Sequence, residues 1–274
     1  MRKQTRRQAF GAHTILLVLA AGFLLPLLGI VFAALHPSGE SVRGLHWPQS
    51  FNWKNFSTAW TDGRLAQLFR SSLIIAGWVV PIAIILATSA GYGLALLRPV
   101  GARPIRAVFL VGLAIPIEVI VVPLYFLLQS FDLTDTYTGV ILAEIALFMP
   151  FGTLWMMTNF ESIPTELVES ARIDGATSWR MLTRVLLPIS WPSIGTLAAL
   201  FFMWSWNQFL LVLILIQNPD KRTVPAGINR FVGEYTTNIP LLSSATLIAI
   251  GPVLIVYLVF QRTFVNGLLQ GAIK

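Results

Sequence analysis

The feature that most limits the fold of this chain is a set of long apolar runs without charge. One of them, TILLVLAAGFLLPLLGIVFAAL at residues 14–35, holds no acidic or basic side chain. A bilayer core ~30 Å thick requires about 20 such residues of a spanning helix, and lipid offers the backbone no partner outside that helix. The whole chain is 55% hydrophobic and 11% charged. These features predict an all-α membrane protein, and the alternation typical of a membrane β-barrel is not found in the sequence.

The hydrophobic pattern predicts six transmembrane helices. Their approximate ranges are 12–35, 73–97, 107–130, 139–159, 193–216 and 243–263. We divide the chain accordingly into three parts. Residues 1–72 hold an N-terminal tail, the first helix and an external loop, residues 73–264 form a five-helix core that includes the charged segment 161–190, and residues 265–274 form a C-terminal tail.

Basic side chains indicate which side of the membrane faces the cytoplasm. They collect before the first span, in loop 98–106 and in segment 161–190, which all fall on one side of a six-span chain. Cytoplasmic loops carry such an excess. We therefore expect a multi-pass plasma (inner) membrane protein with both termini cytoplasmic. The loops account for the net charge of +7, so we expect no nucleic-acid partner.

A charged segment, ELVESARIDGATSWRMLTRVLLP at residues 166–188, separates two apolar runs. A first short helix would present an apolar face made of Ile163, Leu167, Val168 and Ala171. Gly175 can take the left-handed conformation that ends a helix, and Thr177 can cap a second one. The apolar face of the second helix would consist of Trp179, Met181, Leu182, Val185 and Leu186. We expect Pro188 and Pro192 to stop this helix before the fifth span.

The pattern alone leaves two interpretations of these amphipathic helices. They can form a surface loop that lies among the lipid headgroups. Alternatively, they can form a docking element for a soluble partner.

The segment resembles the EAA loop of ATP-binding-cassette importer permeases, whose pattern is roughly E-A-A-x-x-D-G-A, a spacer and L-P. The matching residues are Glu169, Ala171, Asp174, Gly175, Ala176, Leu187 and Pro188. Ser170 stands where alanine is usual. VVPLY, SWNQFL and the ending FVNGLLQGAIK are similar to stretches of the carbohydrate-importing branch, with Gln208 where an acid is common. The resemblance covers about residues 10–274 and is closest to the shorter, six-span permease of the maltose-importer type.

The resemblance implies a type I importer permease fold in which segment 161–190 forms the coupling helix. The residues that would couple to the ATPase are Glu169, Ala171, Arg172, Asp174, Gly175 and Ala176. The implied partners are a homologous second permease, two ATP-binding subunits, an external substrate-binding protein that loop 217–241 would contact, and membrane lipid. ATP and Mg would bind the ATPase subunits. This chain would hold no cofactor and perform no covalent chemistry.

Polar side chains inside the spans are candidates for a translocation path, because they are costly in lipid and usually face a bundle interior or an aqueous route. The candidates are Glu118, Tyr125, Glu144, Trp204, Asn207 and Gln208. Their alternative role is hydrogen bonding between helices. Glu144, Phe148, Phe151 and Trp155 follow helical spacing, and such a stripe more often serves packing than binding.

The function implied is import of a sugar or sugar-like solute. Two alternatives stay open: a proton-coupled secondary transporter that uses Glu118 and Glu144, and a passive scaffold subunit. The sequence contains no G-x-x-x-x-G-K-[ST], H-E-x-x-H or G-x-S-x-G pattern and no cysteine. Oligosaccharides, amino sugars, polyols and glycerol-phosphate esters all remain possible substrates.

Overall fold

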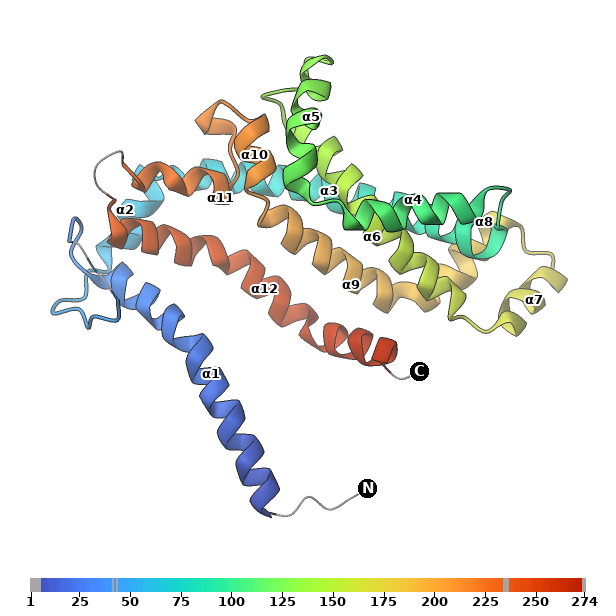
Figure 1. The fold of residues 1–274 in the computed structure, drawn as a ribbon, viewed down its shortest axis with the longest axis horizontal. Helices are drawn as coiled ribbons and strands as arrows, with labels where there is room; N and C mark the ends of the chain where they lie inside the picture. The colour runs from blue at the N-terminus through green and yellow to red at the C-terminus, as the bar shows by residue number, and fades with distance from the viewer. Residues whose placement is uncertain (1–5, 41, 43, 234–236, 273–274) are drawn as a thin grey trace. The chain divides into compact units, whose positions relative to one another are not determined.

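The computed structural model describes residues 6–40, 42, 44–233 and 237–272, and it is almost entirely helical (Figure 1). The α-helices are α1 (Arg6–Leu35), α2 (Lys54–Asp62), α3 (Leu65–Tyr92), α4 (Ala102–Ala114), α5 (Ile117–Gln129), α6 (Tyr137–Glu161), α7 (Thr165–Ile173), α8 (Ser178–Arg180), α9 (Leu187–Trp206), α10 (Leu210–Leu215), α11 (Val224–Gly227) and α12 (Ile239–Ala272). Two π-helical turns, η1 (Gly93–Leu97) and η2 (Met181–Leu186), and two 3₁₀ turns, η3 (Pro219–Lys221) and η4 (Ile228–Phe231), complete the set.

The chain forms two compact units. The first contains α1, α2, η4 and the start of α12, as far as Gly251. Its main polar contact is the buried side chain of Asn55 in α2, which donates to the carbonyl oxygens of Ala34 at 2.8 Å and His36 at 2.6 Å. The bond to Ala34 satisfies one of the last carbonyl groups of α1, which have no partner within their own helix, and the bond to His36 holds the residue that follows the helix.

The second unit contains the helices from Gln67 to Ala226 and the rest of α12. Its core lies where α3, α6 and α9 pack against one another, and Phe148, Phe160, Leu197 and Phe201 are buried there. Gly152 of α6 makes the approach possible, because an added Cβ would lie 2.7 Å from Phe201 and 2.8 Å from Ala87. Small residues let spanning helices pack this closely.

Within the described residues, five helices are long and apolar enough to cross a membrane. They are His13–Leu35, Leu65–Leu97, Tyr137–Glu161, Ser178–Trp206 and Ile239–Gln261. The pair α4 and α5 makes a sixth candidate. The predicted all-α fold is confirmed.

The predicted span over residues 107–130 is broken into two helices. α4 ends at Ala114, α5 begins at Ile117, and the two helices are bent by 106°. Ile115 is extended, with φ −83° and ψ 117°, because a residue that precedes a proline, here Pro116, is driven out of the helical region.

The predicted end of the second amphipathic helix was also wrong. Pro188 and Pro192 do not stop it, since α8, η2 and α9 follow one another without a loop from Ser178 to Trp206. The π turn η2 ends two residues before Pro188, and we attribute the continuity to its wider geometry, which relieves the clash between the proline ring and the preceding turn. The fifth span therefore starts earlier than predicted, and it ends at Trp206 rather than near residue 216.

Candidate functional site

The segment between α7 and α8 turns at Gly175, which has φ +77°. The Gly175 N–H donates to the Arg172 carbonyl and the Ala176 N–H to the Ala171 carbonyl, both at 3.0 Å. These two bonds define a Schellman motif, in which a left-handed residue closes the helix. The turn predicted at Gly175 is therefore present.

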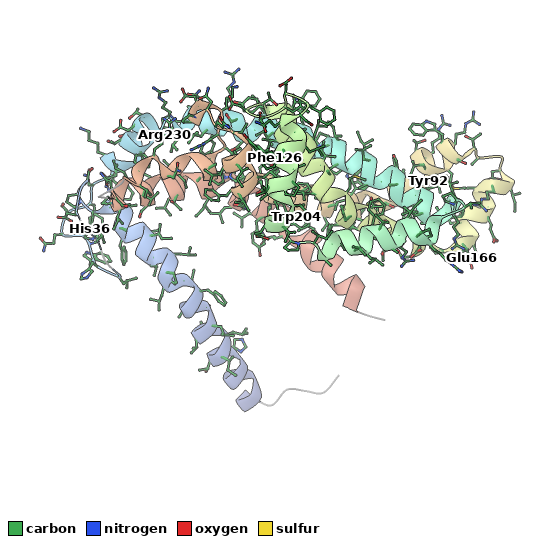
Figure 2. All side chains as sticks on the ribbon, turned by 45° about the horizontal axis from the view of Figure 1, so that its top comes forward. His36, Tyr92, Phe126, Glu166, Trp204 and Arg230 are labelled. Atoms are coloured by element: carbon green, nitrogen blue, oxygen red, sulfur yellow. The ribbon has the colours of Figure 1, made fainter. Side chains whose placement is uncertain are left out.

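The start of α8 is held in two ways. The Thr177 hydroxyl accepts a hydrogen bond from the Arg180 N–H at 3.4 Å, so Thr177 is the N-cap that the sequence predicted. The Tyr92 hydroxyl, at the end of α3, donates to the Ser178 carbonyl at 3.1 Å. Figure 2 shows Tyr92 and Glu166, at the start of α7, near the same end of the second unit. The segment is thus tied to the helical core.

Two faces distinguish this segment (Thr165–Leu186), which we call the coupling segment after the role that the resemblance implies. Its inner face carries Val168, Met181, Leu182 and Leu186, which belong to the buried core of the second unit. Its outer face exposes Glu169, Arg172, Asp174 and Gly175. Ala171 and Ala176 are half-buried where the turn meets the core.

The predicted apolar faces need two corrections. Trp179 is 71% exposed and Leu167 is 38% exposed, so neither packs inward. In α8 the π turn η2 begins two residues after Trp179 and changes the angular step between residues, which turns Trp179 away from Met181 and Leu182. Leu167 lies at the edge of the face that Val168 buries.

Glu144 lies on α6 in the interior of the second unit and is completely buried. Neither of its carboxylate oxygens has a hydrogen-bond partner among the described residues. One helical turn away, Phe148 stacks on Phe201 of α9 with ring centroids 5.0 Å apart. Ser205, one turn beyond Phe201, is buried as well, and its hydroxyl oxygen has no partner in the described chain either.

Aromatic rings of α6 and α9 pack against one another in this part of the core. The Trp204 ring centroid lies 4.9 Å from Phe151 and 5.6 Å from Phe148, and Trp204 remains 39% exposed at the edge of the cluster. Trp155 donates to the Ser193 hydroxyl at 2.8 Å and thereby links α6 to α9. The stripe of Phe148, Phe151 and Trp155 serves helix packing in this structure.

Asn207 and Gln208 mark a break between α9 and α10. The Asn207 side-chain amide donates to the Met203 carbonyl at 2.8 Å, and Gln208 Oε1 accepts from the Leu211 N–H at 3.4 Å. Gln208 thus satisfies an N–H in the first turn of α10. The Met203 carbonyl accepts the Asn207 side-chain amide in addition to the Asn207 backbone N–H. Irregular backbone at membrane depth is tolerated only inside protein or beside a water-filled cavity.

Two further candidates lie on α5. The Tyr125 hydroxyl accepts from Gln217 Nε2 at 3.3 Å, which joins α5 to the segment after α10. Glu118 is exposed in the first turn of α5, directly after the bend from α4. Glu118 and Glu144 therefore occupy different surroundings, one exposed and one buried.

The comparisons with known proteins agree on the class of protein. Residues 79–270 match the family described as "Binding-protein-dependent transport system inner membrane component". The chain belongs to this family. It is 32% identical to the diacetylchitobiose uptake system permease protein NgcG of Streptomyces coelicolor, over 98% of this chain and 90% of the relative.

Other relatives extend the same comparison. The chain is 30% identical to the arabinooligosaccharides transport system permease protein AraQ of Bacillus subtilis, over 94% of this chain and 93% of that protein. It is 32% identical to the sulfoquinovosyl glycerol transport system permease protein SmoH of Agrobacterium fabrum, over 97% of this chain and 93% of that protein.

The fold is similar to that of a bacterial ABC transporter involved in the import of the acidic polysaccharide alginate. The TM-score is 0.80 at 19% identity, over 96% of this chain and 99% of the other. The predicted type I importer permease fold is confirmed, and so is a multi-pass protein of the inner membrane.

Sequence analysis missed an ion pair in the predicted external loops of this permease. The Asn218 backbone N–H donates to Asp135 at 3.0 Å, and the Lys221 ammonium lies 3.0 Å from Asp135 Oδ2. The Asn218 bond and the Lys221 charge hold the pKa of Asp135 below its ordinary value. Asp135 and Lys221 are 86 residues apart in the sequence, so only the fold reveals their pairing. Among the described residues, no cluster of three potential metal ligands occurs.

Proposed function

We propose that this chain and a homologous partner form the translocation path of an ATP-driven importer for a sugar or sugar-like solute. The observation that carries this proposal is the exposed coupling segment, with the sequence E-S-A-R-I-D-G-A on a rigid turn, in a chain of this transport family. Two ATP-binding subunits dock at the coupling segments of the two permeases and hold ATP and Mg. This chain holds no cofactor and catalyses no covalent step.

The outer face of the coupling segment is suited to a charged partner. Glu169, Arg172 and Asp174 are exposed, and among the described residues none of their side chains makes an ion pair or hydrogen bond. Charges arranged in this way direct association and fix its register. Glu169 pairs with a basic side chain of the ATP-binding subunit in this account.

The continuous helix from Ser178 to Trp206 supports a mechanism of transmission. It holds 29 residues, which corresponds to a rod about 40 Å long at 1.5 Å per residue. A displacement of α8 is passed along this rod without an intervening loop to the region of Trp204 and Asn207. Nucleotide-driven closure of the ATPase subunits thereby opens and closes the path.

The far end of this rod combines an aromatic ring with amide groups. Trp204 offers a partly exposed face, and the amide groups of Asn207 and Gln208 follow it in the chain. Tyr125 is joined to Gln217, beyond α10, by a hydrogen bond. Sugars present apolar faces and hydroxyl groups that suit this combination. The names of three relatives refer to uptake or transport of diacetylchitobiose, arabinooligosaccharides and sulfoquinovosyl glycerol, which supports this class of solute.

The remaining partners and the orientation complete the proposal. An external binding protein delivers the solute to the loop after α10, and both termini of this chain face the cytoplasm. The position of basic residues in loop 98–106 and in the coupling segment supports this orientation. The comparisons give no support to a proton-coupled secondary transporter.

Uptake by vesicles that contain the complete complex tests the proposal. The binding protein is supplied with a panel of labelled sugars, and ATP is varied independently of the proton gradient. We expect one class of sugar to stimulate ATP hydrolysis and to accumulate even when an ionophore has collapsed the gradient. Accumulation that follows the gradient and ignores ATP would overturn the proposal.

A further inference from the structure

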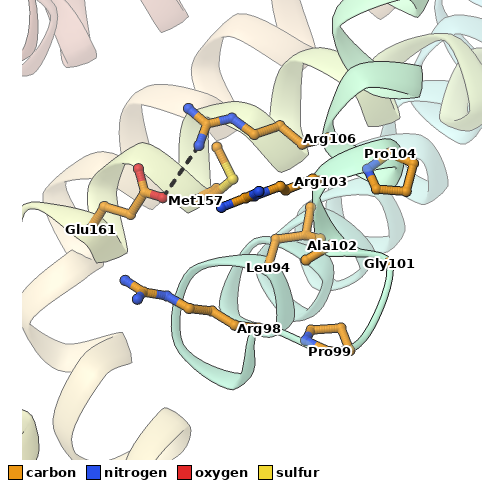
Figure 3. A pocket seen from close by; sticks show the side chains of 10 residues that line it. All are labelled: Leu94, Arg98, Pro99, Gly101, Ala102, Arg103, Pro104, Arg106, Met157 and Glu161. Carbon is orange, nitrogen blue, oxygen red and sulfur yellow. Dashed lines mark ion pairs between the residues drawn. The ribbon is translucent and has the colours of Figure 1, made fainter.

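A cavity of about 530 Å³ lies beside the N-terminal end of α4 (Figure 3). Its charged lining residues are three arginines, Arg98, Arg103 and Arg106, and one acid, Glu161. Arg98 follows η1, two arginines belong to the first turns of α4, and Glu161 ends α6. The cavity therefore gathers charge from three elements at the end of a candidate membrane span.

The charges in this cavity do not balance. Arg106 Nη1 lies 3.6 Å from Glu161 Oε1, and Arg98 Nε donates to the Ala95 carbonyl at 3.0 Å. Arg103 makes no side-chain hydrogen bond or ion pair with any residue that the structure describes. Figure 3 shows the three arginine side chains extending to the same side, toward Glu161. One acid thus faces three cations, and the cavity is suited to a further anion.

The groups present favour a phosphate. A guanidinium group forms paired hydrogen bonds to phosphate oxygens, and more than one such group can serve a single phosphate. Gly101, Ala102, Arg103 and Pro104 also line the cavity. The start of α4 therefore contributes the partial positive charge of a helix N-terminus.

The surroundings indicate that this phosphate belongs to a lipid. Val100 is fully exposed between the arginines, and Ile105 and Val108 expose apolar surface on the adjoining part of α4. No residue of α4 is buried in the described chain. A soluble phosphate has no apolar part that could pack against these exposed side chains, whereas a phospholipid has acyl chains that can lie along them. Arginines that only set topology need not converge on one cavity.

We propose that this cavity binds the phosphate headgroup of an anionic phospholipid. Basic pockets at membrane surfaces bind such headgroups. This site is independent of the solute that the transporter carries, and its occupancy is measurable without transport.

Lipid retention by the purified complete complex tests the site. The complex is placed in nanodiscs of phosphatidylcholine with a small fraction of phosphatidylglycerol, and retained lipids are counted by native mass spectrometry. The variants are Arg103→Gln and Glu161→Gln, which alter the cavity charge in opposite directions. The control is Arg184→Gln, which removes one exposed arginine of the coupling segment outside the cavity.

We expect Arg103→Gln to reduce phosphatidylglycerol retention about fivefold, from the usual contribution of one basic residue at an anionic surface. Glu161→Gln should raise retention, and Arg184→Gln should leave it unchanged. Since Arg103 has no partner among the described residues, its replacement leaves the fold intact.

Three results would overturn the site. Equal losses in Arg103→Gln and Arg184→Gln would mean that only diffuse surface charge attracts the lipid. Displacement of the retained lipid by inorganic phosphate alone would mean that the site takes the free ion. Loss of the ATP-binding subunits in Arg103→Gln, with lipid retention unchanged, would mean that the arginines contact a protein partner.

Discussion

The coupling segment exposes its charged side chains to solvent, whereas Glu144 on α6 is buried in the protein interior. In the coupling segment, Glu169 and Asp174 point outward and apolar residues hold the segment to the core. On α6, by contrast, the Glu144 carboxylate is fully buried, and Phe148, one turn further along, stacks on Phe201 of α9. One helix, from Ser178 to Trp206, connects the two regions.

This difference separates two kinds of requirement within a single permease. An exposed charged face on a rigid turn costs the chain little stability and is available to a partner. A buried carboxylate and the stacked rings of α6 and α9 are part of the packed core itself. Substitutions should therefore affect association in the first region and stability in the second.

The largest expected effect comes from Gly175→Pro. Proline fixes φ near −65°, whereas Gly175 has φ +77°, and the N–H that bonds to Arg172 is lost. We expect proline to destabilise the turn by about 3 kcal/mol. This corresponds to a loss of ATP-driven uptake of roughly a hundredfold. Gly175→Asn is the control, because asparagine tolerates the left-handed conformation and should retain uptake. If Gly175→Pro assembles and transports normally, the turn has no role in coupling.

A pair of aromatic substitutions compares the two regions directly. Phe148→Ala removes a buried ring that stacks on Phe201, and we expect a loss of about 3 kcal/mol in stability. Trp179→Ala removes a ring that is 71% exposed, and we expect a change below about 0.5 kcal/mol.

Thermal unfolding of each variant complex in detergent measures these differences. Trp179→Ala should instead weaken the association of the ATP-binding subunits. A larger loss of stability in Trp179→Ala than in Phe148→Ala would reverse the comparison.

A smaller effect is expected at Asp135, whose pKa is lowered by the Asn218 N–H and by Lys221. A lowered pKa in the folded state stabilises the protein above the ordinary value of 3.8, and this stabilisation is lost as the pH falls through the folded value. Asp135→Asn should cost about 0.5 kcal/mol at pH 7, because the pair with Lys221 is partly exposed. The difference in stability between the wild-type protein and Asp135→Asn, followed by thermal unfolding, should disappear as the pH is lowered. A difference that grows in acid would contradict the prediction.

The smallest effect is expected from Glu144→Gln. Glutamine has the same shape as a carboxylic acid, and an ionised group at this buried position would be costly. We expect stability to change by less than about 0.5 kcal/mol and ATP-driven uptake to persist. Complete loss of uptake with normal folding would contradict this prediction, because transport would then require the carboxyl group of Glu144.

Sequence patterns predicted the parts of this fold that depend on local chemistry. Long apolar runs located most spans, and Gly175 and Thr177 gave the turn and cap of the coupling segment because those roles need particular residue types. The fate of each proline was harder to predict. Pro116 follows an extended residue and breaks a span, whereas Pro188 and Pro192 lie within a continuous helix.

The sequence did contain a signal that a new helix begins after the break between α4 and α5. Pro116 stands before α5 and Glu118 in its first turn, which is a common way for a helix to begin. Nothing local distinguishes Pro188, since the outcome there depends on the π turn η2 and on packing of Leu186 in the core. The pairing of Asp135 with Lys221 and the stacking of Phe148 on Phe201 depend on contacts between distant segments.

The central claim, that the coupling segment receives the ATP-binding subunit, is tested most directly by cross-linking. The chain has no cysteine, so Ser170→Cys introduces a single thiol beside Glu169. Ser130→Cys is the matched control, because both serines are exposed and each hydroxyl donates to the carbonyl three residues earlier. A thiol-to-amine reagent should join position 170, and not position 130, to the ATP-binding subunit. A cross-link from position 130 alone, in a complex that still transports, would contradict the account.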